Sequence, residues 1–246
     1  MNENGNRKIY IRSWGGNTIS HNEYPTIYIA GDSTAASYPI ERAPQAGWGQ
    51  VLHQFFTDDI TISNEAASGR SSKSFIVEKR LTKINEHIKE NDYLFIQFGH
   101  NDSKTDERFT DPFTDFKHYL KQYIHVAKKH KAKPILLTPV QRRSFDEYEN
   151  VNETHGNYPE AIIQLGKEEN VPVIDLGKRS KEYFENIGTE NTKKIFLWLD
   201  PDEHSNYPNG LQDNTHFSKN GALEVAKLIV EGIRDLDLPI EKYLIY

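Results

Sequence analysis

The stretch TIYIAGDSTAAS, residues 26–37, decides the fold class of this chain. Its first half is a continuous run of β-branched, aromatic and aliphatic residues, which is typical of a strand buried on both faces of a parallel sheet. The run stops at Gly31, Asp32 and Ser33, which predicts a tight turn at the carboxyl end of that strand. Such a turn presents a side chain at the edge of the sheet. Ser33 is therefore either an ordinary turn residue or a nucleophile.

Four further apolar runs resemble the first one, and helical patterns lie between them. They are ITISNEA at 60–66, YLFIQFG at 93–99, PILLTP at 134–139 and VPVIDL at 171–176. This alternation predicts an α/β three-layer α/β/α sandwich around a five-stranded parallel sheet. No internal repeat or interdomain linker is evident. We therefore expect one domain over residues 26–246, preceded by an N-terminal arm or extra strand over residues 1–25.

Two helices are well marked by their first residues and their apolar faces. One follows Asp111 as N-cap and Pro112, and its predicted face is Phe113, Phe116, Leu120, Tyr123, Ile124 and Ala127. The other is opened by Ser218, and its predicted buried face is Ala222, Val225, Ala226, Ile229 and Ile233. Weaker helical patterns cover residues 48–56, 74–89 and 159–169. Two long polar segments, 141–158 and 199–216, are predicted to be functional loops.

The composition limits the function classes that fit this chain. Its 246 residues are 36% hydrophobic and 27% charged, with a net charge of −6 and no cysteine. The acidic balance argues against a nucleic-acid partner, and no apolar run approaches the roughly 20 residues of a membrane span. The absence of cysteine excludes disulfides and thiolate chemistry. The first residues lack the apolar core of a secretion signal, which favours a cytoplasmic location, with the mature domain of a secreted protein as the alternative.

Polar clusters follow three of the predicted strands, where open parallel sheets bind ligands. They are GDST at 31–34, ASGRS at 67–71 and GHND at 99–102, and a fourth cluster, DNTH at 213–216, precedes the last helix. These parts suit acyl transfer without a cofactor. Ser33 is the predicted nucleophile, His216 its base and Asp213 the acid that orients the imidazole. The backbone N–H groups of Ser33 and Gly69 and the amide of Asn101 are the predicted oxyanion hole.

The ordered set GDST, SGRSS, GHND and DxxH resembles the four blocks of the SGNH, or GDSL-type, hydrolases. Six longer stretches are similar to the rhamnogalacturonan acetylesterase branch of that family: GDSTAA, GWGQ (47–50), NEAASGRSSKSF (64–75), FGHND (98–102), TPVQRRSF (138–145) and LQDNTHFSKNGA (211–222). The resemblance implies a flavodoxin-like sandwich, no metal, and removal of acetyl groups from pectic rhamnogalacturonan. It also implies that Ser33, Gly69, Asn101 and His216 are the family's four name-giving residues.

Other interpretations of these clusters stay open at this stage. His100 and Asp102, together with Asp213 and His216, could form a metal site without cysteine. The favoured interpretation is that His100 is a structural histidine whose polar atoms are satisfied, and that Asp32 and Asp102 are supporting acceptors. The chain could also be an esterase or lipase for another acyl group, or a carbohydrate-binding module that performs no chemistry.

Three arginines and one tryptophan are candidates for contact with the sugar chain. Arg70, Arg142 and Arg143 follow predicted strands and lie on the expected active edge, where guanidinium groups could grip galacturonate carboxylates. The alternative for the arginines is internal pairing or plain surface exposure. Trp48 in GWGQ is predicted to be a core residue rather than a platform for sugar rings.

Overall fold

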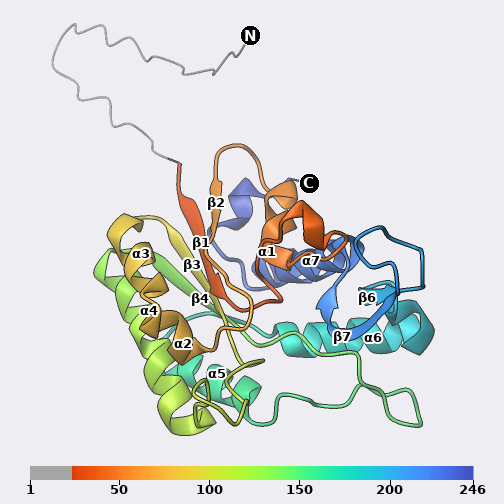
Figure 1. The fold of residues 1–246 in the computed structure, drawn as a ribbon. Helices are drawn as coiled ribbons and strands as arrows, with labels where there is room; N and C mark the ends of the chain where they lie inside the picture. The colour runs from red at the N-terminus through yellow and green to blue at the C-terminus, as the bar shows by residue number, and fades with distance from the viewer. Residues whose placement is uncertain (1–23, 246) are drawn as a thin grey trace, which may run out of the picture.

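A five-stranded parallel sheet in the order β2-β1-β3-β4-β5 lies at the centre of the computed structural model, which describes residues 24–245 (Figure 1). The strands are β1 Thr26–Gly31, β2 Thr61–Asn64, β3 Tyr93–Gln97, β4 Lys133–Leu137 and β5 Val173–Ile174. All five predicted strands are present and all pairings are parallel. The last strand is shorter than predicted because Asp175 already caps the helix that follows.

Helices cover both faces of the sheet, so the predicted three-layer sandwich is confirmed (Figure 1). The helices are α1 Trp48–Val51, α2 Ser72–Val77, α3 Arg80–His87, α4 Lys117–Lys129, α5 Tyr158–Glu169, α6 Leu176–Thr192 and α7 Lys219–Asp235. Strand β3 is apolar except for Gln97 because it contacts helices on both of its faces. Phe95 packs into the cluster with α1, α6 and α7, whereas Leu94 and Ile96 pack into the cluster with α2 to α5.

The two well-marked helices begin where the sequence predicts. The Asp111 carboxylate accepts hydrogen bonds from the N–H groups of Phe113 and Thr114, and a π-helical turn over Pro112–Phe116 then leads into α4. Ser218 caps α7 by accepting from the Gly221 N–H, and all five residues predicted for its buried face are buried. One face prediction is wrong. Phe113 is 43% exposed, because the wide first turn rotates it away from the face of α4 that packs on the sheet.

Three helical segments differ from the prediction. The pattern over residues 74–89 is two helices, because Lys79 adopts a left-handed backbone conformation (φ 61°) between α2 and α3. The pattern over residues 48–56 is the short α1 followed by a 3-10 turn over Leu52–Phe55. Helix α6 was not predicted at all, and it is kinked at Gly188 (φ 80°). Further 3-10 turns lie at Ile40–Arg42 and Glu241–Tyr243.

A second sheet of two antiparallel strands, β6 Phe196–Leu199 and β7 Leu211–Phe217, stands beside α6 and α7 (Figure 1). The prediction that residues 199–216 form a loop is therefore wrong for its last third. Polar residues occupy β7 because one face of this small sheet is open to solvent. In consequence, Asp213 and His216 lie on a strand rather than in a loop.

The remaining predictions concern the N-terminal arm and membrane-spanning segments. Residues 1–23 lie outside the described residues, and with them nearly all of the predicted arm or extra strand over residues 1–25. In the part of the chain that the structure describes, none of the helices combines the length and the apolar character needed to span a membrane.

Candidate active site

The side chains of Ser33, His216 and Asp213 form a continuous hydrogen-bonded chain. Ser33 lies in the turn after β1, and its Oγ is 3.0 Å from His216 Nε2. His216 Nδ1 is 2.7 Å from Asp213 Oδ2. Because the ionised carboxylate can only accept, Nδ1 carries the imidazole proton, and Nε2 is left to accept the hydroxyl proton of Ser33. Two residues that are 183 positions apart in the sequence are thereby joined.

The carboxylate of Asp213 also shapes the backbone that carries His216. Its Oδ1 accepts hydrogen bonds from the N–H groups of Thr215 at 2.7 Å and His216 at 2.9 Å. Burial alone raises the pKa of Asp213, but the hydrogen bonds and the charge of His216, together with these backbone bonds, outweigh burial and hold the pKa below its ordinary value. Asp213 is therefore an ionised acceptor at neutral pH.

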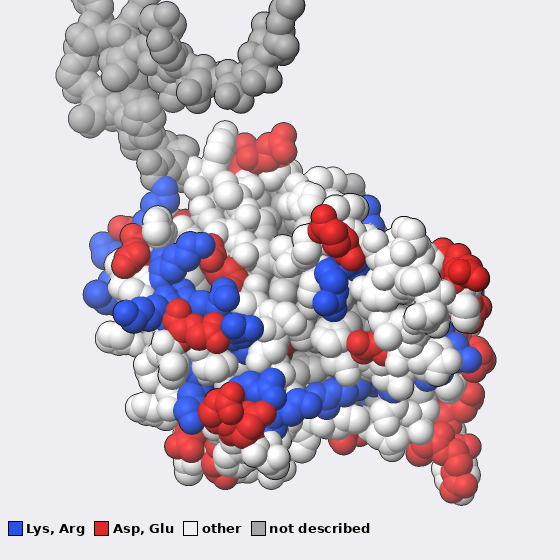
Figure 2. Space-filling model, viewed as in Figure 1, with Lys and Arg blue, Asp and Glu red and all other residues white. Residues whose placement is uncertain are grey.

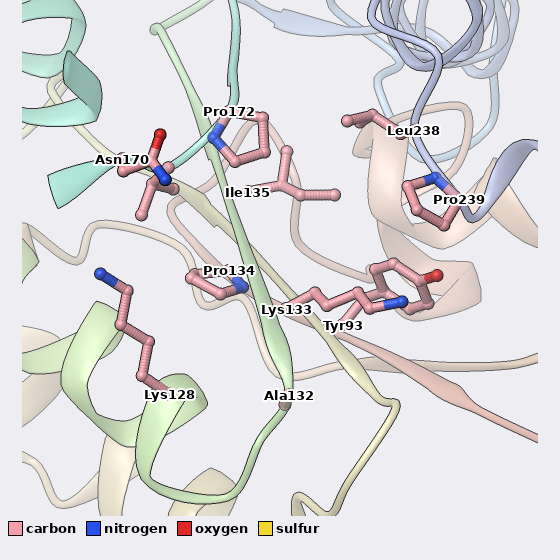
Figure 3. Close-up of a pocket in the computed structure, with 11 residues that line it drawn as sticks. Tyr93, Lys128, Ala132, Lys133, Pro134, Ile135, Asn170, Pro172, Leu238 and Pro239 are labelled. Carbon is pink, nitrogen blue, oxygen red and sulfur yellow. The ribbon is translucent and has the colours of Figure 1, made fainter.

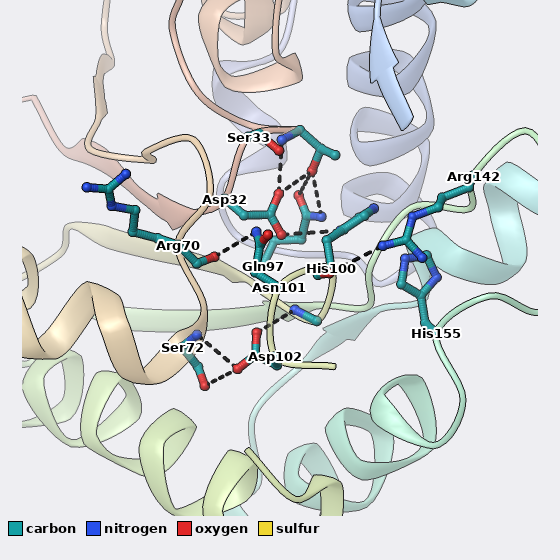
Figure 4. A network of polar contacts seen from close by, with 12 residues as sticks. Asp32, Ser33, Arg70, Ser72, Gln97, His100, Asn101, Asp102, Arg142 and His155 are labelled. Carbon is teal, nitrogen blue, oxygen red and sulfur yellow. Dashed lines mark hydrogen bonds and ion pairs between the residues drawn. The ribbon is translucent and has the colours of Figure 1, made fainter. Parts of the chain in front are cut away.

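Gly69 and Asn101 come from the loops after β2 and β3, next to one another at the same edge of the sheet. Gly69 has a left-handed backbone (φ 80°), and a Cβ there would meet nothing within 4 Å. Glycine is thus required by the backbone conformation and not by crowding. Asn101 Nδ2 donates to the Arg70 carbonyl at 3.1 Å, which ties the two loops together (Figure 4). An amide nitrogen has two N–H groups, so one of them is left for a ligand.

A buried network supports the Ser33 turn from below (Figure 4). Asp32 accepts from the Thr34 N–H at 2.9 Å and hydroxyl at 2.8 Å, and its other oxygen is 3.2 Å from His100 Nδ1. Burial raises the pKa of Asp32, but the charge of His100 and the hydrogen bonds of His100 and Thr34 lower it more, so the pKa lies below its ordinary value. His100 is structural, as predicted, but only one of its ring nitrogens is satisfied, since Nε2 has no partner among the described residues.

One more histidine, His155, and one more aspartate, Asp102, belong to this buried region. The His155 ring packs edge-on against His100, with centroids 4.4 Å apart, and burial, assisted by the charges of His100 and Arg142, holds the pKa of His155 well below its ordinary value. Asp102 is the supporting acceptor that the sequence predicts. It accepts from the N–H and hydroxyl of Ser72, and burial raises its pKa to about 6.

The GWGQ segment packs directly on the Ser33 turn. The N–H groups of Gly47 and Trp48 donate to the carbonyls of Ala36 and Thr34, at 3.1 and 2.9 Å. Trp48 is fully buried, and its indole N–H donates to Gln97 at 2.6 Å. The prediction that Trp48 is a core residue is confirmed.

The three candidate arginines are all engaged within the protein. Arg70 forms an ion pair with Glu78 at 2.9 Å and donates to the Ser68 carbonyl. Arg142 donates to the carbonyls of His100 and Thr154, both at 3.2 Å (Figure 4). Arg143 donates to the Thr189 carbonyl at 3.0 Å, and its guanidinium lies 4.6 Å from the centroid of the Trp198 ring. Their contact with a substrate stays a prediction.

The structure does not assemble the metal site that the sequence left open. Within residues 24–245, no group of three or more histidine, cysteine, aspartate or glutamate side chains is arranged to hold a metal ion. His216 is bonded to Asp213 through Nδ1 and to Ser33 through Nε2, whereas Asp102 is turned toward Ser72.

Several residues around the site were missed by the sequence analysis. The Tyr38 hydroxyl donates to the Ser33 carbonyl at 2.7 Å, and burial raises the pKa of Tyr38 to about 12. Arg108 donates to the Gly69 carbonyl at 3.4 Å. Gln97, which bonds to Thr34 and Trp48, was also missed, although it is a polar residue at the end of an otherwise apolar strand and so carried a signal in the sequence.

A pocket of about 260 Å³ lies at the opposite edge of the sheet (Figure 3). Its lining includes Tyr93 and Lys133, the first residues of β3 and β4, together with Pro134, Pro172 and Leu238. It contains none of the predicted site residues.

Comparison with known proteins adds independent evidence. The chain is 48% identical to the rhamnogalacturonan acetylesterase RhgT of Bacillus subtilis over 89% of this chain and 94% of that protein. It is 41% identical to the probable rhamnogalacturonan acetylesterase YesY of the same organism, over 89% and 97%. The crystal structure of B. subtilis YxiM superposes with a TM-score of 0.76 at 30% identity, and this chain covers 57% of that one.

A more distant structure shares the fold alone. Axe2, an acetylxylan esterase from Geobacillus stearothermophilus, matches with a TM-score of 0.60 at 14% identity, over 86% of this chain and 96% of that one. The family model described as GDSL-like lipase/acylhydrolase matches residues 27–229, and this chain belongs to that family.

Proposed function

We propose that this protein is a serine esterase that removes O-acetyl groups from pectic rhamnogalacturonan through an acetyl-enzyme. The observation that carries the proposal is the chain of contacts from Ser33 Oγ through His216 to Asp213, at 3.0 and 2.7 Å. The choice of substrate is supported by the names of the two Bacillus relatives, which align over nearly their whole length.

In the first step, Ser33 Oγ attacks the acetyl carbonyl carbon while His216 Nε2 takes the hydroxyl proton. The new positive charge on the imidazole is stabilised by the ionised Asp213. The negative charge moves to the carbonyl oxygen, for which the N–H groups of Ser33 and Gly69 and the free N–H of Asn101 are the proposed donors. These donors come from three loops that the hydrogen bonds described above hold in place.

Collapse of this intermediate breaks the bond between the carbonyl carbon and the sugar oxygen. His216 returns its proton to that oxygen, so the sugar leaves as an alcohol and the acetyl group stays on Ser33. Water then attacks the acetyl carbonyl carbon while His216 takes one of its protons. The bond to Ser33 Oγ breaks, His216 returns the proton to that oxygen, and acetate is released.

The test is acetate release by the wild type and by a Ser33→Ala variant. We expect the variant to lose several orders of magnitude in kcat with its thermal unfolding unchanged, since only binding and oxyanion stabilisation remain. Ser37→Ala is the matched control, because Ser37 lies just after the turn, four residues from Ser33, and contacts Asn64 and not His216. A Ser33→Ala variant with a tenth of the wild-type activity would contradict the assignment of the nucleophile.

The substrate is tested by comparing acetylated rhamnogalacturonan with acetylated xylan and short-chain lipid esters. We expect the highest kcat/KM on rhamnogalacturonan. A higher kcat/KM on acetylated xylan or on lipid esters would mean that the same catalytic residues act on a different substrate. No turnover of any ester, including p-nitrophenyl acetate, would leave a carbohydrate-binding module as the explanation.

A further inference from the structure

Strand β7 contains more residues than its partner β6 can pair with. Leu197 pairs with Asp213, but the preceding residue, Phe196, pairs with Phe217. Residues 214–216 therefore bulge out of the ladder. Bulges of this kind are common beside active sites, where they redirect a side chain. Here the last bulged residue is His216, so the position of the imidazole depends on the conformation of the bulge.

The first bulged residue, Asn214, is held from outside the strand. Its Oδ1 accepts a hydrogen bond from Trp198 Nε1 at 2.9 Å and lies 3.5 Å from Arg143 Nη1. Its backbone carbonyl accepts from the Arg143 N–H at 2.9 Å. Side chain and backbone of Asn214 are thus both bonded to residues that lie elsewhere in the sequence, Trp198 on β6 and Arg143 after β4.

Arg143 is itself fixed by its surroundings. Its guanidinium stacks on the Trp198 ring at 4.6 Å from the centroid, and its Nη2 donates to the Thr189 carbonyl at 3.0 Å. Within the described residues it forms no ion pair with a carboxylate. A guanidinium held by an aromatic face and a carbonyl is a rigid support, because its planar donors are already oriented.

We propose that Asn214, Arg143 and Trp198 form a clamp that positions His216 against Ser33. The proposal rests on the proposed function, in which His216 is the base. It makes Arg143 a positioning residue rather than a contact for substrate carboxylates. The carboxylate of Asp213 also holds the bulge through two backbone bonds, so removing the clamp weakens the alignment without abolishing it.

The test uses p-nitrophenyl acetate, which has no carboxylate for an arginine to bind. Asn214→Ala and Trp198→Phe each remove the 2.9 Å hydrogen bond, and Phe keeps an aromatic ring beneath Arg143. We expect each variant to lower kcat about 10-fold with little change in KM, because a small displacement of a catalytic group slows the chemical step. The double variant is expected to lose no more than about the larger of the single losses, since both changes break one interaction.

Lys193→Ala is the matched control. Lys193 lies 5.1 Å from the centroid of the same Trp198 ring but has no contact with Asn214, so its removal should leave kcat unchanged. Full kcat in both Asn214→Ala and Trp198→Phe, or losses that simply multiply in the double variant, would overturn the clamp. An inactive wild type, or a Ser33→Ala variant as active as the wild type, would instead overturn the proposed function on which the clamp rests.

Discussion

The amide nitrogen of Asn101 carries two N–H groups, one bonded to the backbone and the other proposed as an oxyanion donor. One N–H of Asn101 Nδ2 donates to the Arg70 carbonyl at 3.1 Å. That bond fixes the direction of the second N–H. A donor fixed before the reaction costs no reorganisation when charge develops on the substrate oxygen. The buried position of Asn101 strengthens this effect, because water competes weakly there.

Replacing Asn101 by alanine is therefore expected to lower kcat by about 10² or more, with little change in KM. The measurement is steady-state kinetics on p-nitrophenyl acetate and on acetylated rhamnogalacturonan. A raised KM with an unchanged kcat would show that Asn101 binds the ground state of the substrate, and the oxyanion hole would then need another donor.

Asp102 makes the stability of the fold depend on pH. Its carboxylate accepts from Ser72, Gly99 and Thr110, but burial outweighs these bonds and raises its pKa to about 6, from 3.8 in the unfolded chain. Between these two values the folded protein holds a proton that the unfolded chain has lost. This contribution to stability is fully present below about pH 4 and is lost as the pH rises toward about 6.

We expect the free energy of unfolding of the wild type, relative to Asp102→Asn, to fall by on the order of 2–3 kcal/mol between about pH 4 and 6. The measurement is urea unfolding of both proteins across this range. A difference that stays constant, or that grows with pH, would show that the fold does not raise the pKa of Asp102.

At the scale of elements, the site depends on the close contact of α1 with the turn that follows β1. A Cβ on Gly49 would lie 2.6 Å from the Ala35 carbonyl oxygen and 2.8 Å from Asn64 Nδ2. Asn64 also donates to that carbonyl, at 2.8 Å. Because Gly49 has no side chain, α1 can pack closely against the backbone just after Ser33 and support it.

Gly49→Ala is expected to lower the stability of the protein by about 1–3 kcal/mol and to lower the kcat of the folded enzyme as well. The loss of stability arises because the helix must move away from the turn, and the loss of kcat because Ser33 moves with it. The measurements are chemical unfolding and steady-state kinetics.

Gly166→Ala on α5 is the control, since a Cβ there would lie 2.2 Å from a Val173 methyl group, which is remote from Ser33 in the fold. It should destabilise the protein without changing the kcat of the folded fraction. If both variants keep full kcat, the contact between α1 and the turn stabilises the fold without aligning the nucleophile.

For the whole molecule, the distribution of charge matters more than its sum. The net charge is −6, yet the proposed substrate carries a carboxylate on every galacturonate. Figure 2 shows a band of Lys and Arg side chains across the lower middle of the face in view, between regions where both signs are mixed. The local band attracts the substrate carboxylates, whereas the net negative charge repels them. Salt screens both interactions, so the direction in which KM changes with salt shows which one dominates.

We expect the KM for acetylated rhamnogalacturonan to rise several-fold as the ionic strength increases from about 0.05 to 0.5 M, while the KM for p-nitrophenyl acetate stays constant. Arg142→Ala should raise the KM for the polysaccharide at low salt and reduce its salt dependence. A KM that falls with salt would mean that the net negative charge dominates. Equal losses on both substrates in Arg142→Ala would mean that this arginine supports the fold through His100 and Thr154.

The amino-acid sequence by itself determined the central sheet and the residue types at its active edge. Strands β1, β3 and β4 are buried on both faces over most of their length and are therefore largely apolar, so their runs were recognisable without knowledge of their neighbours. The edge strand β2 is only partly buried. The same logic placed Ser33, Gly69 and Asn101 together, because carboxyl ends of parallel strands meet at one edge. The spacing of Asp213 and His216 was also a local signal.

Only the tertiary structure decided how these parts are held. The roles of Trp198, Arg143 and Asn214 depend on contacts between segments far apart in the chain, and no periodicity within any one segment encodes them. The strand β7 escaped prediction for the same reason, since its polar residues are stabilised by pairing with β6 and not by their own propensity. Local sequence specifies which chemistry a residue can perform, whereas alignment of that chemistry arises from long-range packing.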